Sequence, residues 1–213
     1  MVPPVDLYLD YACPWSYLAL IRLGETALRT GARISFRPIV LDEVLKKAEP
    51  PLPLQRDDIH PARQHYQSKD LDDWARYCGV ALNCPETWPA PSETAARGAL
   101  AADSQGRCAA YSKEIYLAYF SAGEDIADPG VLARAAARAG LDAEAFIQAL
   151  AGNSPTETLE KNCMELLQRG GFGAPTMFVQ DEMFFGHDRI PLVEFAIGQA
   201  SDRRFVAPGN HSA

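Results

Sequence analysis

The chain has 213 residues, of which 47% are hydrophobic, and its 20 basic and 28 acidic residues give a formal net charge of −8. A chain of this length can bury one sizeable core without disulfide bonds. The negative charge, with no dense run of lysine and arginine, excludes the electrostatic pattern of proteins that bind nucleic acid or anionic membranes. No stretch reaches the ~18 apolar residues of a membrane span, so we expect a soluble protein that is not exported.

The cysteines are odd in number, irregularly spaced and without a Cys-x-x-Cys pair. This pattern is typical of neither a disulfide framework nor a zinc site. We therefore expect no bound metal, and a reducing cytoplasm as the compartment. The five are Cys13, Cys78, Cys84, Cys108 and Cys163.

The first third of the chain predicts a right-handed βαβ unit. Residues 5–11 are rich in β-formers, and residues 15–29 carry apolar side chains near helical spacing. Gly31 is well placed to end that helix in the left-handed conformation. Residues 34–40 form the second expected strand, and Pro38, which lacks an amide donor, puts part of it at an edge or end.

The middle of the chain has no strand signal and predicts an inserted helical region. Helices are expected over residues 61–78, 92–121, 129–139, 143–150 and 156–169. Strand chemistry returns at 176–179 and 183–185, which a short polar link would join as a hairpin, and a last helix follows over 190–200. We expect one α/β domain made of residues 1–45 and 172–201, a helical insertion over 46–171, and a disordered tail over 202–213.

Cys13-Pro14-Trp15-Ser16 lies where the first strand passes into the first helix. The unpaired amides and the dipole of a helix start favour negative charge, so we expect the pKa of Cys13 to be lowered and its sulfur to be nucleophilic. Ser16 takes the place of the second sulfur of a redox Cys-x-x-Cys pair, which excludes an internal disulfide. The alternative is that Cys13 is a small core residue at a strand end.

These elements resemble the DsbA branch of the thioredoxin superfamily, with Cys13-Pro14-Trp15-Ser16 at the first junction and Gly173-Ala174-Pro175-Thr176 before the penultimate strand. Within that branch the chain is most similar to the 2-hydroxychromene-2-carboxylate isomerases and the kappa-class glutathione transferases. The resemblance extends over nearly the whole chain and is carried by the sequence segments 10–18, 172–178 and 185–189. The resemblance implies a thioredoxin fold (βαβ…ββα) interrupted by an all-helical domain, a homodimer, and glutathione as the cofactor.

The resemblance also implies a glutathione site between the helix start at Cys13, Pro14 and Trp15 and the segment opposite. A cis bond before Pro175 would leave the backbone groups of Ala174 unpaired, so that they hold the cysteine of glutathione. The alternative is an ordinary trans proline that ends a loop.

Four further residues carry less specific signals. In the family pattern, Asp188 receives the γ-glutamyl ammonium of glutathione, although it could equally be the N-cap of the last helix. His187 stands at a neighbouring position of the pattern; it could hydrogen-bond the ligand and titrate near neutral pH, or be a plain surface histidine. Lys69 lies one residue out of register with a basic position of the family. Trp88 could roof a hydrophobic co-substrate pocket or simply staple its loop.

The chain departs from the pattern at Cys13, where most relatives of this kind have a serine that donates to the glutathione thiolate. Two mechanisms remain open: Cys13 stays protonated and supports that thiolate, or Cys13 is itself the thiolate and forms a mixed disulfide with glutathione. Ser16 could donate the hydrogen bond instead. The asparagine that the family places after the second strand is not evident, since Ala48-Glu49-Pro50-Pro51 occupies that stretch.

The resemblance implies that glutathione adds reversibly to an electrophilic, aromatic or unsaturated organic acid, as in an isomerase of aromatic degradation, or is transferred to it. A second hypothesis is a monothiol oxidoreductase in which Cys13 exchanges with glutathione mixed disulfides. A third is a ligand-binding protein that keeps the fold without the chemistry.

Overall fold

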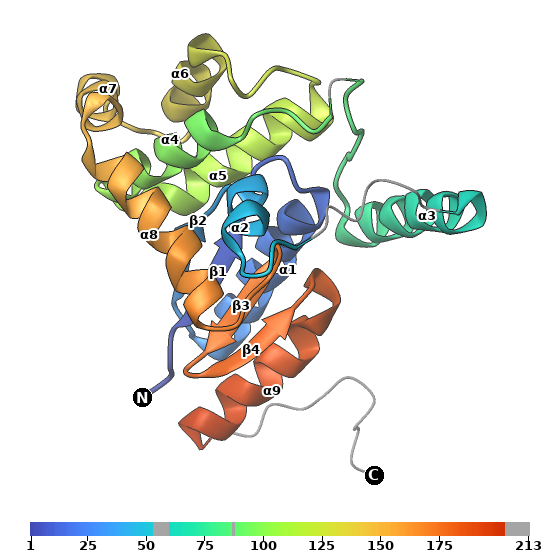
Figure 1. The fold of residues 1–213 in the computed structure, drawn as a ribbon. Coiled ribbons are helices and arrows are strands. Elements are labelled where there is room, and N and C mark those ends of the chain that lie inside the picture. The colour runs from blue at the N-terminus through green and yellow to red at the C-terminus, as the bar shows by residue number, and fades with distance from the viewer. Residues whose placement is uncertain (53–59, 87, 203–213) are drawn as a thin grey trace.

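The computed structural model describes residues 1–52, 60–86 and 88–202. Figure 1 shows a small sheet with helices packed around it and a group of helices, α4 to α7, gathered beyond one end. Nearly all of the expected tail over 202–213 lies outside the described residues. Within the described ranges, no helix has both the length and the apolar character that crossing a membrane requires.

The sheet has the strand order β2-β1-β3-β4. β1 (Val5–Leu9) pairs in parallel with β2 (Ile34–Pro38) and antiparallel with β3 (Thr176–Val179), which continues through a tight hairpin into β4 (Glu182–Phe185). The predicted βαβ and ββα units are therefore confirmed. Pro38 lies at the end of an edge strand, where its missing amide costs no ladder hydrogen bond.

Two helices complete these units. α1 (Pro14–Thr30) joins β1 to β2 and ends at Gly31, whose φ of 74° is the predicted left-handed cap. α9 (Ile190–Ser201) packs against α1, β3 and β4. A single 3-10 turn, η2 (His187–Arg189), leads from β4 into α9.

The helical region consists of α3 (Pro61–Cys78), α4 (Glu93–Asp103), α5 (Cys108–Tyr116), the π-helical turn η1 (Leu117–Ser121), α6 (Pro129–Arg138), α7 (Ala143–Ala151) and α8 (Ser154–Gln168). α4 is its centre and contacts α5, α6, α7 and α8. Its core-facing alanines are buried and let the neighbouring helices approach closely. α3 differs, since it lies mostly exposed beside α1.

The sheet and the helical region share one hydrophobic cluster, which includes Leu7 of β1 and Tyr111 of α5. Aromatic rings join them most directly. The ring of Tyr17 on α1 stacks on Tyr116, with 5.1 Å between the ring centroids, and on Phe120, at 6.1 Å. The division into two domains stays a prediction, because this core runs through both.

Two expectations about the helices are wrong. The single helix expected over 92–121 is broken between α4 and α5, where Gly106 takes a φ of 66° that interrupts helical geometry. A short helix, α2 (Leu41–Lys47), was not expected. It follows β2 directly and packs on α8, so that β2 ends at Pro38 and not at residue 40.

Candidate functional site

Cys13 occupies the N-cap of α1, in extended conformation, and Pro14 is the first residue of the helix. The side chain is 8% exposed. Its thiol donates a hydrogen bond to the carbonyl oxygen of Ala174, with 3.4 Å between sulfur and oxygen. The strand-to-helix junction and the start of β3, far apart in sequence, thus meet at this sulfur, as the resemblance implied.

The peptide bond between Ala174 and Pro175 is cis, as predicted. The carbonyl of Ala174 is not unpaired, however, because it accepts the thiol hydrogen of Cys13, which corrects the expectation of a free carbonyl. The carbonyl of Pro175 accepts a hydrogen bond of 2.9 Å from the Gly186 amide. This bond fixes the segment before η2 beside the start of β3.

The expected lowering of the Cys13 pKa is wrong for the free protein. Burial, which disfavours the charged thiolate, raises the pKa of Cys13 to about 11, and the negative charge of Asp10 adds to that rise. The Ser16 hydroxyl and the amides of Ser16 and Trp15 act in the opposite direction without prevailing. Cys13 is therefore a thiol at neutral pH in the free protein.

Ser16 lies with Cys13 at the helix start, as predicted, and its side chain is fully buried. Its hydroxyl oxygen accepts a hydrogen bond of 3.3 Å from the Asp10 amide. The hydroxyl also interacts with the Cys13 thiol in the sense that favours the thiolate. Ser16 can therefore donate to an anionic sulfur at this position.

A cavity of about 440 Å³ opens beside the Cys13–Ala174 contact, and we call it the Trp15 cavity. The structure brings five of the predicted site residues together in its wall: Trp15, Ala174, Pro175, His187 and Asp188. Five more lining residues were not assigned to the site from sequence: Tyr66, Asp70, Trp74, Phe185 and Gly186. Tyr66, Asp70 and Trp74 are spaced four residues apart on α3, a signal that sequence reasoning could have used to find this face.

His187 is buried, at 5% exposed, so its interpretation as a surface histidine is wrong. Its ring lies between Trp15, with 4.8 Å between the centroids, and Trp74, at 4.6 Å. Burial, helped by the charge of Arg22, lowers the pKa of His187 to about 4, so the expected titration near neutral pH is wrong as well. Among the described residues, its buried Nε2 atom has no hydrogen-bond partner.

Asp188 is exposed and forms an ion pair with Arg189, with 3.5 Å between the charged atoms. The N-cap of α9 is Arg189, and Asp188 lies within η2, so its interpretation as the N-cap of the last helix is wrong. Asp188 also lines the Trp15 cavity, where this exposed ion pair could be exchanged for a ligand's cation.

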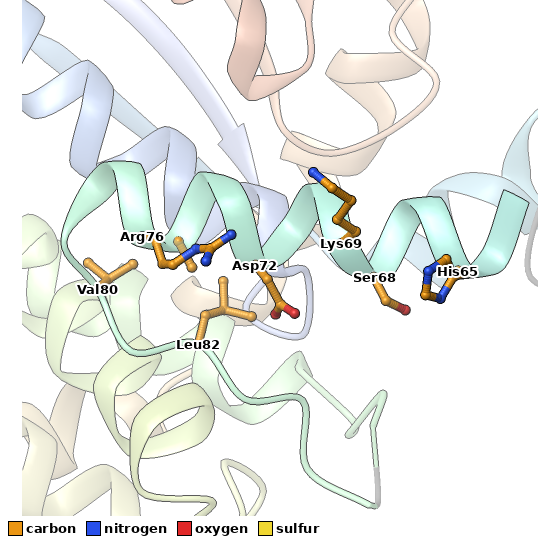
Figure 2. Close-up of a pocket in the computed structure, with 8 residues that line it drawn as sticks. His65, Ser68, Lys69, Asp72, Arg76, Val80 and Leu82 are labelled. Atoms are coloured by element: carbon orange, nitrogen blue, oxygen red, sulfur yellow. The ribbon is translucent and has the colours of Figure 1, made fainter.

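Lys69 is not brought to the Trp15 cavity. It is exposed on α3 and pairs with Asp73, one turn further along. Figure 2 shows it at a second cavity, of about 490 Å³, between α3 and the chain that follows it, where Val80 and Leu82 form part of the wall.

Trp88 lies close to the site from another direction. Its indole nitrogen donates a hydrogen bond of 2.8 Å to the carbonyl oxygen of Ala12, the residue before Cys13, and its ring packs against the core. A third cavity, of about 320 Å³, has Asp10 and Ala12 in its wall together with Leu41 and the segment 89–93 that follows Trp88. The side chain therefore staples its loop, as one of the two interpretations predicted.

Asp10 was missed as a site residue. Its side chain is 4% exposed, and its oxygens accept hydrogen bonds of 2.7 Å from the Ala12 amide, 2.7 Å from the Leu41 amide and 3.0 Å from the Ser92 hydroxyl. Its own backbone carbonyl accepts from the Cys13 amide at 3.1 Å. Asp10 directly follows β1, and Asp6 within β1 is an aspartate of the same sequence segment whose side chain is partly exposed.

Comparisons with known proteins show which family the chain belongs to. The family model for the DSBA-like thioredoxin domain matches residues 4–198. A 2-hydroxychromene-2-carboxylate isomerase from Sphingobium xenophagum is 32% identical over 194 residues, which cover 91% of this chain and 97% of that protein. Human glutathione S-transferase kappa 1 is 23% identical over 213 residues, with 92% of this chain and 91% of that protein covered.

A solved structure of a 2-hydroxychromene-2-carboxylate isomerase superimposes with a TM-score of 0.80 at 30% identity, and the match covers 92% of this chain and 95% of that one. The similarity therefore extends through the sheet and the helical region alike. The chain belongs to the DSBA-like thioredoxin domain family and, within it, to the group of the 2-hydroxychromene-2-carboxylate isomerases.

Proposed function

We propose that this protein is a glutathione-dependent isomerase of an unsaturated aromatic organic acid, of the 2-hydroxychromene-2-carboxylate type. One observation carries the proposal: the Cys13 thiol at the start of α1 donates to the carbonyl of Ala174, and Ala174 lines a cavity whose wall also contains His187 and Asp188. A helix start, the backbone groups before a strand and an acidic side chain are the groups that a cysteinyl peptide with a free ammonium requires.

The cavity residues fit glutathione. The backbone of Ala174 would pair with the cysteine of the tripeptide, and the carboxylate of Asp188 would receive the γ-glutamyl ammonium, with Asp70 on the same wall. The buried Nε2 of His187, which lacks a partner within the described residues, would gain one from a polar group of the ligand. Pro14 and Trp15 would complete the site as the first residues of α1.

When bound there, glutathione supplies the sulfur nucleophile that adds to the conjugated double bond of the acid and leaves again once that bond has rotated. The amides of Trp15 and Ser16 stabilise negative charge at the helix start. Cys13, held as a thiol by burial, would turn its hydrogen from the Ala174 carbonyl toward that charge, and Ser16 would provide a second donor from the same turn. Of the two open mechanisms, this favours Cys13 as a hydrogen-bond donor.

The acid would enter from the side of the third cavity, next to Ala12. Trp88, by holding its loop to Ala12, would keep the wall of that cavity in place over the Cys13 turn. Among the described lining residues Lys46 is the cation, and it would have to exchange its partner Glu43 for the carboxylate of the acid.

We further infer a cytoplasmic location and a homodimer. All five cysteines lie in the described part of the chain and are free, as expected in a reducing compartment. Large apolar side chains of β4 and α9, namely Phe185, Leu192 and Phe195, are exposed and would suit a second copy. Light scattering coupled to size exclusion tests the dimer directly.

The decisive experiment measures the conversion of 2-hydroxychromene-2-carboxylate by absorbance, with and without glutathione, and counts free thiols before and after. We expect conversion that requires glutathione and consumes none. Loss of glutathione thiol in proportion to the acid converted would instead identify a transferase. No conversion, together with no heat of glutathione binding by calorimetry, would leave a protein that keeps the fold without the chemistry.

The second candidate is a monothiol oxidoreductase, favoured by the sulfur that stands at position 13 in place of a hydroxyl. Its raised pKa argues against a fast thiolate exchange. Reduction of a glutathionylated peptide at neutral pH separates the two candidates, because only the oxidoreductase requires the Cys13 sulfur to form a covalent bond.

A further inference from the structure

The carboxylate of Asp10 connects the Cys13 turn to two other parts of the molecule. One oxygen accepts from the amide of Ala12 inside the turn, and the other accepts from the Leu41 amide at the start of α2 and the Ser92 hydroxyl at the start of α4. The backbone of Asp10 adds bonds to the Cys13 amide and to the Ser16 hydroxyl. A single buried side chain thus fixes the turn that carries the sulfur.

The hydrogen bonds indicate that Asp10 is ionised. Both oxygens already accept from donors, and none of the three donors is charged. Carboxylates held by several such donors keep their charge even when buried. Burial itself acts in the other direction and raises the pKa of Asp10, and the nearby Asp42 adds to this rise.

The other titratable groups around Cys13 do not cancel that charge. Tyr116 of α5 donates its hydroxyl to the Asp10 carbonyl and stays protonated, since burial raises its pKa. Tyr11, in the turn after β1, is fully buried, and its hydroxyl shares a hydrogen bond of 2.6 Å with the Ser112 hydroxyl. His187 is neutral above its lowered pKa of about 4. The cation of the adjoining cavity, Lys46, pairs with Glu43.

We propose that Asp10 is a positioning residue that, together with burial, keeps Cys13 protonated, because its buried carboxylate holds the turn at Ala12 and brings a negative charge to the residue next to Cys13. Cys13 then serves as a donor to a ligand's sulfur and not as a nucleophile. That role as a donor rests on the proposed function, whereas the effect of Asp10 on Cys13 does not.

The test compares Asp10→Asn with Ser92→Ala. The first variant removes the charge, while the second removes one donor to the same carboxylate and keeps the charge. Alkylation of Cys13 by iodoacetamide is followed against pH, and the Cys13 peptide is quantified by mass spectrometry to separate it from the other cysteines. Asp42→Asn serves as the charge control, because it removes another acid from the wall of the third cavity, which Asp10 also lines.

We expect the pH midpoint of Cys13 alkylation to fall by about one unit in Asp10→Asn. At any pH well below the midpoint, this is a tenfold gain in the thiolate fraction. In Ser92→Ala and Asp42→Asn the midpoint should stay within a few tenths of a unit of the wild type. An unchanged midpoint in folded Asp10→Asn overturns the proposal. So does an equal fall in Ser92→Ala, because loosening of the turn would then explain the effect.

If Asp10→Asn does not fold, the wild-type chain labelled with carbon-13 at aspartate carboxyls gives the answer by NMR. We expect the Asp10 resonance to be that of a carboxylate at neutral pH and to shift again when Cys13 ionises. A protonated Asp10 at neutral pH overturns the proposal. Neither experiment contains glutathione, so the proposed function can fail while this inference stands, and the reverse is equally possible.

Discussion

The Cys13 thiol lies 3.4 Å from the carbonyl oxygen of Ala174, to which it donates. A ligand that pairs its backbone with Ala174 would compete for this carbonyl and free the thiol to turn toward the ligand's sulfur. The contact therefore couples occupation of the cavity to the direction in which Cys13 donates.

Replacing Cys13 by serine tests which role the sulfur has. A hydroxyl donates at least as well as a thiol, so we expect Cys13→Ser to retain glutathione-dependent isomerisation within about tenfold of the wild type, a change of roughly 1.4 kcal/mol in the barrier. Reduction of glutathionylated peptides should be abolished. Cys84→Ser, at an exposed cysteine, is the control. Loss of isomerisation with retained glutathione binding would instead identify Cys13 as the nucleophile.

Replacing Asp188 by asparagine tests the acidic rim of the Trp15 cavity. If Asp188 receives the ammonium of glutathione, the Asp188→Asn variant should bind glutathione about tenfold more weakly. The reason is that a hydrogen bond to a charged group contributes roughly 1.5 kcal/mol. Calorimetry measures the change. The control is Asp181→Asn, in the β3–β4 turn, which should bind as the wild type does. Equal affinities for all three proteins would place the ammonium elsewhere.

The burial of His187 predicts a pH dependence of stability. Its pKa is about 4 in the folded protein against 6.5 for the free side chain, so the unfolded chain takes up a proton first as the pH falls. Stability should therefore be complete above pH 6.5 and decline toward pH 4, by up to about 3 kcal/mol from this residue.

Urea unfolding at the two ends of that pH range measures this decline. In His187→Gln the part due to this residue should disappear, and in His65→Gln, at an exposed histidine of α3, it should remain. The same decline in His187→Gln as in the wild type would show that other groups cause it.

The close approach of Gly98 to Tyr111 leads to a prediction about packing. A Cβ atom at Gly98 would overlap the hydroxyl of Tyr111, which is buried against α4. We expect Gly98→Ala to destabilise the protein by about 1–3 kcal/mol, and Tyr111→Phe to relieve part of that loss in the double variant. Gly24 in α1 has open space at the same position, so Gly24→Ala should stabilise by up to about 1 kcal/mol. Thermal melts of the four proteins check the signs.

The meeting of Cys13 with Ala174 could be predicted from sequence because each residue lies in a short motif at the end of a strand, and the order of strands fixes which ends adjoin. The cis bond before Pro175 followed from the same motif. The spacing on α3 could reveal a shared face but could not assign that face to the site. Tyr66, Asp70 and Trp74 lie on one face of the predicted helix, but the direction of that face depends on how α3 packs against α1.

Electrostatics were harder to predict than geometry. The amides at the start of α1 do favour a Cys13 thiolate, as a local argument says, yet burial outweighs them. Burial depends on the Ala174 segment, and the charge of Asp10 adds to the rise in the Cys13 pKa; neither is visible in the four residues of the motif. The break between α4 and α5 has a simpler reason. Both flanking segments contain helix-favouring alanines, so the sequence predicts one continuous helix across the turn at Gly106.

The stack of Tyr17 on Tyr116 and Phe120 has a consequence for how such proteins can be recombined. Because α1 contributes one ring and the helical region the other two, neither part carries a finished surface of its own. A chimaera that takes this helical region from a distant relative would also need that relative's α1, including the turn that bears the residue at position 13. The helical region and α1 would therefore have to be exchanged together.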